Sequence, residues 1–184
     1  GNPAVVMWQA ENEPFFPFGE CPPISEDFVG REITALKAID PARPVMTTDT
    51  GEWSLWIRAA KLGDVVGVTL YRKAYFPALH TYLSFPFPPA YYRLRALVIR
   101  QFFGKDVISV EVQAEPWFRA YPLGTSEDDW KETLDIGQFR KNIRYARDTG
   151  FPELYLWGAE WWWYMKEKRN IPDFWEEAKT LFKS

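Results

Sequence analysis

Short apolar segments alternate along the chain with longer segments in which apolar residues recur every three or four positions. The short segments are rich in β-branched residues and are predicted to be strands, at residues 5–13, 45–50, 64–71, 106–112 and 153–157. The longer segments are predicted to be helices, at residues 25–39, 53–61, 90–103, 136–149 and 172–182. Because strands and helices alternate and the strands are nearly all apolar, we expect a parallel sheet covered on both faces.

Local signals mark the ends of two helices. Ser25 can cap the first predicted helix with its hydroxyl group. Gly150 directly follows the fourth, where glycine suits the positive φ that commonly ends a helix. Prolines and aromatic residues fill positions 73–89 without either period, so we expect a long loop there.

Side-chain types alternate within two of the predicted strands. In the third strand the aliphatic residues share one face and Tyr71 ends the other. In the fourth strand Ile108 and Val110 share one face, and Ser109 and Glu111 the other. In a (β/α)₈ barrel the aliphatic face contacts the helices, and the opposite face points inward and forms the site at the carboxyl end. We therefore expect Tyr71 and Glu111 to point into a site.

Aromatic residues are abundant, with 10 Trp, 9 Tyr and 14 Phe. Many lie outside the predicted strands, among them Trp53, Trp56 and the block at 161–163. Aromatic rings stack on the flat C–H faces of sugars, which favours a carbohydrate site. An aromatic-rich core or a protein interface would produce the same composition, so both interpretations stay open.

Charge and rare residues narrow the classes of function. The net charge is −3 and the basic residues are scattered among acids, so we expect no nucleic-acid partner. The single Cys21 allows no internal disulfide, and the single His80 makes a multi-histidine metal site or a Ser-His-Asp triad a poor fit. No apolar run reaches the ~20 residues of a membrane helix, and no strand is followed by a glycine-rich phosphate loop. We expect no metal, no cofactor and no membrane span; the localisation stays open.

Two strand ends carry glutamates beside a proline, Glu13 before Pro14 and Glu115 before Pro116, with Glu111 at the end of the aliphatic run. Proline disfavours the helical conformation in the preceding residue, so Glu13 is expected to leave its strand extended. Two carboxyl groups facing one axis are what glycoside cleavage requires, one as the acid and one as the nucleophile. A single strand-end glutamate is more often a helix cap or an ion-pair partner; the pair favours the chemical role.

The segment Trp8-x-x-x-Asn12-Glu13-Pro14 resembles the fourth-strand signature of glycoside hydrolase clan A, the retaining glycosidases on (β/α)₈ barrels. The resemblance implies that Glu13 is the acid/base and that Asn12 contacts the sugar 2-hydroxyl. It also implies a nucleophile at the end of the seventh strand. The charge of that nucleophile is expected to raise the pKa of Glu13.

Counting strands from that signature extends the resemblance over the whole chain. The predicted seventh strand ends at Glu111, which would be the nucleophile. Tyr71 matches a tyrosine at the end of strand six that hydrogen-bonds the nucleophile, and Trp157 matches a tryptophan at the end of strand eight that forms the floor of the sugar site. Residues 1–184 would thus be a single catalytic domain, the C-terminal portion of a barrel from strand four to helix eight.

Strands one to three of such a barrel are missing from the chain. We expect an upstream segment or a partner, which could be another copy, to cover the open sheet edges. Glu115 rivals Glu111 as the nucleophile. Trp117, Glu115 and Glu160 are further candidates for contacts with a carbohydrate substrate.

A second function from another class fits the same residues. The chain could be a non-catalytic carbohydrate-binding or interaction domain derived from a degenerate barrel. The missing strands favour this alternative, and the retained glutamate pair favours the enzyme. No motif identifies the sugar or its linkage, or separates attack on chain ends from attack within chains.

Overall fold

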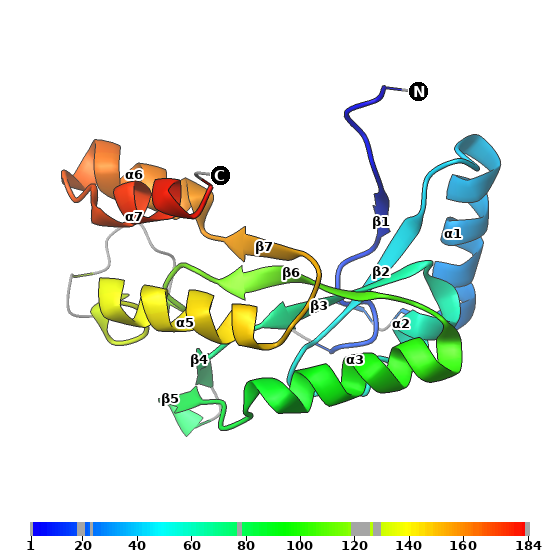
Figure 1. The fold of residues 1–184 in the computed structure, drawn as a ribbon, viewed down its shortest axis with the longest axis horizontal. Coiled ribbons are helices and arrows are strands. Elements are labelled where there is room, and N and C mark those ends of the chain that lie inside the picture. Colours follow the sequence, from blue (N-terminus) through cyan, green and yellow to red (C-terminus); the bar gives the residue numbers. More distant parts are fainter. Residues whose placement is uncertain are drawn as a thin grey trace.

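Five parallel strands form one curled sheet, a half-barrel, in the computed structural model (Figure 1). The structure describes residues 2–17, 21–22, 24–76, 79–118, 126 and 130–182. The strands pair in the order β1 (Trp8–Ala10), β2 (Val45–Asp49), β3 (Val65–Leu70), β6 (Val107–Gln113) and β7 (Leu154–Trp157). All five predicted strands are confirmed, although β1 is only three residues long.

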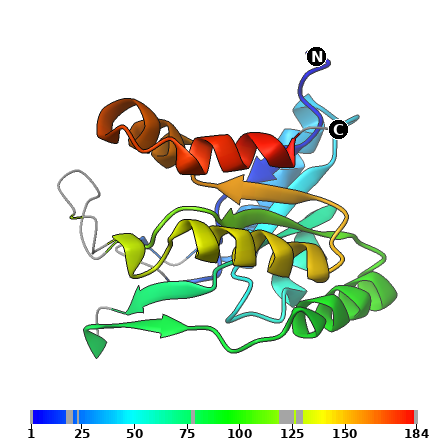
Figure 2. The same cartoon turned by 60° about the vertical axis from the view of Figure 1, so that its left-hand side comes forward.

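Helices follow the strands and cover the outer face of the sheet (Figures 1 and 2). They are α1 (Glu26–Ile39), α2 (Ile57–Leu62), α3 (Pro89–Phe103), α5 (Ile136–Asp148), α6 (Ala159–Arg169) and α7 (Asp173–Leu181). Ser25 caps α1 by accepting a hydrogen bond from the backbone N–H of Phe28, as predicted. Gly150 follows α5 with a φ of 76°. The five predicted helices are therefore confirmed, and α6 is an addition.

The core lies between the sheet and these helices. Its larger part joins the outward side chains of β3, among them Val66 and Val68, to α3, α5, α6 and α7. A smaller cluster joins β1 and β2 to α1 through Val29 and Val45. The outer faces of the strands are thus buried as the aliphatic pattern predicted for β3.

Two segments differ from the prediction. The expected loop at 73–89 contains an antiparallel hairpin of β4 (Lys73–Phe76) and β5 (Thr81–Ser84), in which Tyr75 and Tyr82 pair across the strands edge to face at 5.2 Å. The tryptophan block belongs to α6, which buries Trp161 and Trp162. Apolar residues on several sides of α6 leave no single apolar stripe in the sequence to reveal a helix.

The predicted faces of β6 are wrong at three positions: Ser109, which pairs with the outward Val68, and Ile108 and Val110. Ile108 and Val110 line an inner groove with Met46 and Tyr155, rather than contacting the helices. The register between β3 and β6 shifts at this point, so that Val68 pairs with Ser109 and Thr69 with Glu111. A bulge at Val110 therefore breaks the alternation, and Glu111 faces inward despite following another inward residue.

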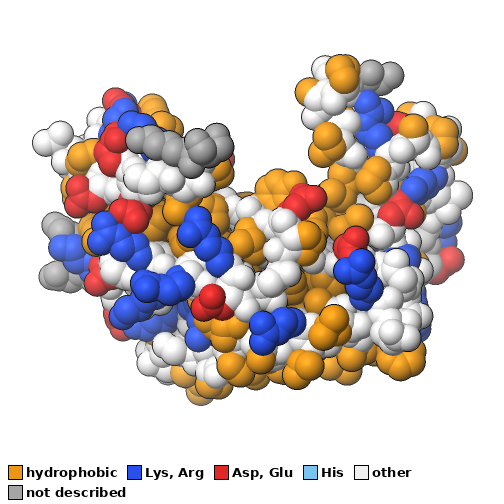
Figure 3. All heavy atoms as spheres, viewed as in Figure 1, with side chains coloured by type: hydrophobic (Ala, Val, Ile, Leu, Met, Phe, Trp, Pro, Cys, Tyr) orange, Lys and Arg blue, Asp and Glu red, His pale blue; other side chains and the backbone are white. Residues whose placement is uncertain are grey.

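The inner face of the half-barrel is open among the described residues. β1 and β7 each pair with a single neighbouring strand. Figure 3 shows a hollow between the N-terminal segment and the lobe of α6 and α7. The apolar groove of Ile108 and Val110 has a volume of about 340 Å³, and Val6, at its rim, is 70% exposed.

Candidate active site

Glu13 lies just beyond β1 in a tight turn. Its φ is 45°, so the predicted extended conformation is wrong. The turn is closed by a hydrogen bond from the N–H of Phe16 to the carbonyl oxygen of Glu13, and the N–H of Glu13 donates to the hydroxyl oxygen of Thr48 at 2.7 Å. Positive φ costs a non-glycine residue about 1–3 kcal/mol and persists where neighbouring contacts impose it, often at functional sites.

The carboxyl group of Glu13 is largely desolvated. The hydroxyl of Thr69, on β3, donates to its Oε1 at 3.1 Å. Burial raises the pKa of Glu13 to about 7; the Thr69 hydrogen bond opposes this shift, and the charges of Glu111 and Asp49 add to it. Burial, rather than the expected charge of Glu111, is thus the main cause. At neutral pH this carboxyl group can carry a proton.

Glu111 lies near the end of β6, where it is held by Tyr71. The Tyr71 hydroxyl donates to Glu111 Oε2 at 2.7 Å, and Trp117 packs edge to face against the Tyr71 ring at 5.1 Å. Burial raises the pKa of Glu111, and the hydrogen bond from Tyr71 lowers it. Burial and the Glu111 charge raise the pKa of Tyr71, so Tyr71 remains a donor.

One cavity of about 340 Å³ brings the two glutamates together. Its lining includes five residues from the sequence prediction: Asn12, Glu13, Tyr71, Glu111 and Trp117. Aromatic side chains of the β4–β5 hairpin and the segment after it, Tyr75, Phe76 and Phe85, line the same cavity. Two acids beside apolar rings, in a cavity large enough for a small molecule, suit a sugar ring.

Glu52 and Thr69 line this cavity without having been predicted. Glu52 follows β2, and its carboxyl group accepts hydrogen bonds from the backbone N–H of Tyr71 and the hydroxyl of Tyr92. In the sequence Glu52 directly precedes the helix predicted at 53–61, where an acid is common beside a helix N-terminus. Thr69 lies two positions before Tyr71 on the inward face of β3, and Leu70 between them points outward. The alternation of side chains in β3 therefore indicated that Thr69 faces the site.

Trp157 and Glu115 form a separate pair beside the cavity. The indole N–H of Trp157 donates to Glu115 Oε1 at 2.9 Å, and Trp157 is 49% exposed. Neither is among the residues that line the cavity of Glu13 and Glu111. Glu160 is exposed in the first turn of α6. Burial is the main cause that raises the pKa of Glu115; the hydrogen bond from Trp157 opposes this shift, and the charge of Glu160 adds to it.

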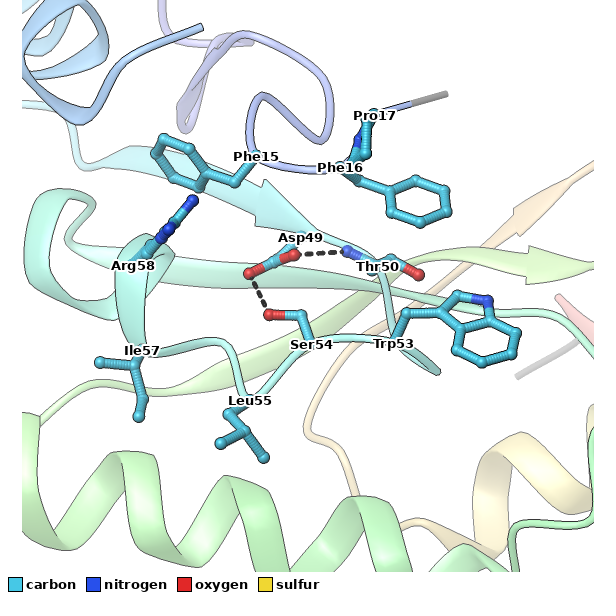
Figure 4. A pocket seen from close by; sticks show the side chains of 10 residues that line it. All are labelled: Phe15, Phe16, Pro17, Asp49, Thr50, Trp53, Ser54, Leu55, Ile57 and Arg58. Atoms are coloured by element: carbon cyan, nitrogen blue, oxygen red, sulfur yellow. Dashed lines mark hydrogen bonds between the residues drawn. The ribbon is translucent and has the colours of Figure 1, made fainter. Parts of the chain in front are cut away.

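A second pocket of about 460 Å³ adjoins the cavity and shares Phe16, Thr50 and Trp53 with it. Figure 4 shows Asp49 hydrogen-bonded to Thr50 and Ser54 at the centre of this pocket. Trp53, at the boundary, is 56% exposed. The other candidate tryptophans divide: Trp56, Trp161 and Trp162 are buried in the core, and Trp163 is exposed.

The described part of the chain contains neither a metal-binding group of side chains nor a membrane-spanning helix. No group of three or more His, Cys, Asp or Glu side chains there could hold a metal ion. No helix within it is long and apolar enough to cross a membrane.

Comparison with known proteins identifies the fold. No known family model and no curated protein match the sequence. Among solved structures, a GH2 β-galacturonidase from Eisenbergiella tayi bound to galacturonate is similar with a TM-score of 0.54 and 17% identity, over 84% of this chain and 26% of that chain. A β-glucuronidase from Bacteroides uniformis is similar with a TM-score of 0.53 and 18% identity, over 84% of this chain and 19% of that chain.

These likenesses place the half-barrel among folds found in β-glycosidases. The chain spans about a quarter or less of the length of the two solved structures. At this level of identity the likeness establishes the fold, and a function has to be argued from the site.

Proposed function

We propose that this chain carries the catalytic residues of a retaining glycoside hydrolase of clan A, which cleaves a β-linked oligo- or polysaccharide. The observation that carries the proposal is the cavity shared by Glu13 and Glu111, two carboxyl groups in different environments. Different environments for paired carboxyl groups separate the roles of acid and nucleophile. The fold likeness to β-glycosidases supports the same class of reaction.

Glu13 acts first as the acid. Burial raises its pKa to about 7, so it can hold a proton and give it to the glycosidic oxygen as the bond to the leaving group breaks. The ionised Glu111, stabilised by the Tyr71 hydroxyl, attacks the anomeric carbon and forms a glycosyl-enzyme. Glu13, now ionised, then takes a proton from water, whose oxygen displaces Glu111 from the sugar.

The remaining predicted residues bind the sugar. Asn12 lines the cavity and would contact the 2-hydroxyl group. Trp117 would border the ring inside the cavity, and Trp157 would form its floor from the end of β7. Glu115 and Glu160 would contact sugar hydroxyl groups near the β7 edge. The second pocket, with Trp53 at its boundary, is suited to a further sugar unit of the substrate (Figure 4).

Glu111 fits the nucleophile better than Glu115. Glu111 shares the cavity with Glu13 and receives the Tyr71 hydroxyl. Glu115 accepts the indole N–H of Trp157 and lies outside the lining of that cavity. A nucleophile must lie close to the acid to give retention, about 5–5.5 Å away, which favours the glutamate in the shared cavity.

We further propose that residues 1–184 are one catalytic domain, corresponding to strands four to eight of a (β/α)₈ barrel. The open inner face and the unpaired sides of β1 and β7 fit a barrel that is completed by an upstream segment or by another chain.

Hydrolysis of a panel of aryl β-glycosides by the full-length protein tests the proposed function. Glu13→Ala and Glu111→Ala should each lower kcat by about 10²–10⁴-fold, because each removes one of the two chemical groups. Glu167→Ala, at an exposed position on α6, is the matched control and should keep full activity. If both site variants match the wild type, the assignment fails. Binding of oligosaccharide without any turnover would support the carbohydrate-binding alternative.

A further inference from the structure

Glu52 is a buried carboxyl group to which the proposed reaction gives no role. It is 4% exposed and lies in the turn after β2. A Cβ atom on the preceding Gly51 would lie 1.7 Å from the carbonyl oxygen of Thr69, so only glycine lets this turn pack so closely on β3. Arg95, from α3, donates to the carbonyl oxygens of Gly51 and Ser54, on either side of Glu52. The backbone around Glu52 is therefore held firmly.

The Glu52 side chain connects this turn to the nucleophile. Its Oε1 accepts hydrogen bonds from the backbone N–H of Tyr71 at 2.9 Å and from the Tyr92 hydroxyl at 3.1 Å. The other end of Tyr71 donates to Glu111 at 2.7 Å. Building on the proposed function, we propose that Glu52 is a positioning residue. Its uncharged carboxyl group fixes the main chain of Tyr71, and the Tyr71 hydroxyl then fixes Glu111.

The charge state follows from what surrounds the Glu52 carboxyl group. Burial raises the pKa of Glu52 to about 8. The hydrogen bonds from Tyr71 and Tyr92 oppose that shift, and the charge of Glu13 adds to it. Glu52 is therefore protonated over the pH range in which Glu13 can act as an acid.

The positive charge of Arg95 favours an ionised Glu52, and burial of the carboxyl group outweighs that effect. The guanidinium group of Arg95 is engaged by two main-chain carbonyl oxygens and stacks over the rings of Trp56 and Tyr91, each at 3.9 Å. Burial raises the pKa of Tyr145, on α5, so its hydroxyl stays neutral. The charges of Glu52 and Glu13 repel each other, which also favours an uncharged Glu52.

Two substitutions show whether Glu52 acts as an uncharged hydrogen-bond acceptor or through a negative charge. Glu52→Gln keeps an oxygen for both donors and cannot ionise, so kcat at about pH 6 should stay within about threefold of the wild type. Glu52→Leu keeps the volume and removes the acceptor, so kcat should fall about 10–100-fold with little change in KM, because a misplaced nucleophile harms the transition state. Glutamine losing as much as leucine would overturn the inference.

The acid side of the pH–rate profile shows whether the effect passes through Tyr71. The Tyr71 hydrogen bond lowers the pKa of Glu111, so losing it should move the acid limb of kcat/KM to higher pH. We expect that move in Tyr71→Phe and Glu52→Leu, and not in Glu52→Gln. Adding Glu52→Leu to Tyr71→Phe should cost little more. Fully additive losses, or an unmoved limb in Glu52→Leu, would contradict the route through Tyr71.

A measurement without substrate tests the charge state alone. Glu52 has a pKa of about 8 in the folded protein against 4.5 for an unperturbed glutamate, so its stabilising contribution is complete below about pH 4.5 and is lost as pH rises to about 8. The Tm of the wild type relative to Glu52→Gln should fall over that range. A constant Tm difference overturns this inference, whereas an inactive wild type overturns only the proposed function.

Discussion

At the scale of single residues, the site depends on how each carboxyl group is desolvated and hydrogen-bonded. Glu13 receives one hydroxyl donor from Thr69, and Glu111 receives one from Tyr71. Both donors come from one face of β3 and the position that follows it, and both lower the pKa of an acid against the larger effect of burial. We therefore expect that a change on β3 alone alters the pH dependence of activity.

Thr69→Val should move the alkaline limb of kcat/KM. Glu13 must be protonated to act as an acid, so wild-type activity should fall as pH rises through about 7. The Thr69 hydrogen bond stabilises the ionised form, and its loss raises the pKa further. The limb should therefore shift to higher pH, which a pH–rate profile measures.

Thr34→Val, on the exposed surface of α1, is the matched control for the same chemical change. Its profile should superimpose on that of the wild type. A limb that moves to lower pH in Thr69→Val would contradict the role of Thr69.

The residues of the site were predictable where a strand pattern or the Asn12-Glu13-Pro14 motif marked them. Tyr71 followed from the alternation in β3, and Glu111 from its place at the end of an aliphatic run, although the bulge breaks the alternation expected in β6; the structure brings the two into contact. Glu52 could not be predicted, because its burial depends on Tyr92, forty positions along the chain. The extended conformation predicted for Glu13 was wrong because the contact with Thr48 outweighs the preference imposed by Pro14.

At the scale of elements, the bulge between β3 and β6 decides which way Glu111 points. The inward Val110 lies against Gly67, where an added Cβ would be 2.8 Å from Val110 Cγ1 and 2.8 Å from Met46 Sδ. Glycine at this position of β3 therefore makes room for the bulge. Strand alternation predicts one inward residue in two, and no sequence signal marked Val110 as the exception.

Gly67→Ala should destabilise the protein by about 1–3 kcal/mol, because the new methyl group overpacks the inner face. Chemical denaturation measures the free energy of unfolding.

Gly30→Ala provides a control of opposite sign. A Cβ there would meet only Leu62 Cδ2 at an ordinary 3.7 Å, within α1. Alanine should stabilise that helix by about 0.5–1 kcal/mol. If both variants change the free energy of unfolding alike, the explanation that a methyl group at position 67 overpacks the inner face is wrong.

At the scale of the whole molecule, the order of the elements was predictable from the sequence. The curvature that leaves the inner face open was not. The apolar strands and amphipathic helices specify a parallel sheet with an outer helical layer, which the structure confirms. The hairpin of β4 and β5 was missed because its aromatic pairs lie among prolines and resembled a loop. Curvature, which creates the exposed inner face, has no local signature in the sequence.

The exposed inner face predicts association of the isolated chain. Val6 and Tyr155, at the rim of the inner groove, are 70% and 47% exposed, beside unpaired strand edges. Sedimentation velocity should show concentration-dependent association, which Val6→Lys with Tyr155→Lys should weaken.

Lys substitutions at Leu94 and Leu97, which are exposed on the outer surface of α3, are the comparison for that experiment. Association weakened only by the α3 pair, or an isolated chain that is monomeric throughout, would contradict the open inner face as the cause.

The central claim is that Glu111 is the nucleophile and Glu13 the acid/base. Chemical rescue by azide tests it most directly, in the full-length protein with an aryl β-glycoside, read by product stereochemistry. In Glu111→Ala, azide should attack the anomeric carbon from the vacated side and give the α-glycosyl azide. In Glu13→Ala, azide should intercept the glycosyl-enzyme and give the β-glycosyl azide. Rescue of Glu115→Ala with the α product, and not of Glu111→Ala, would contradict the account.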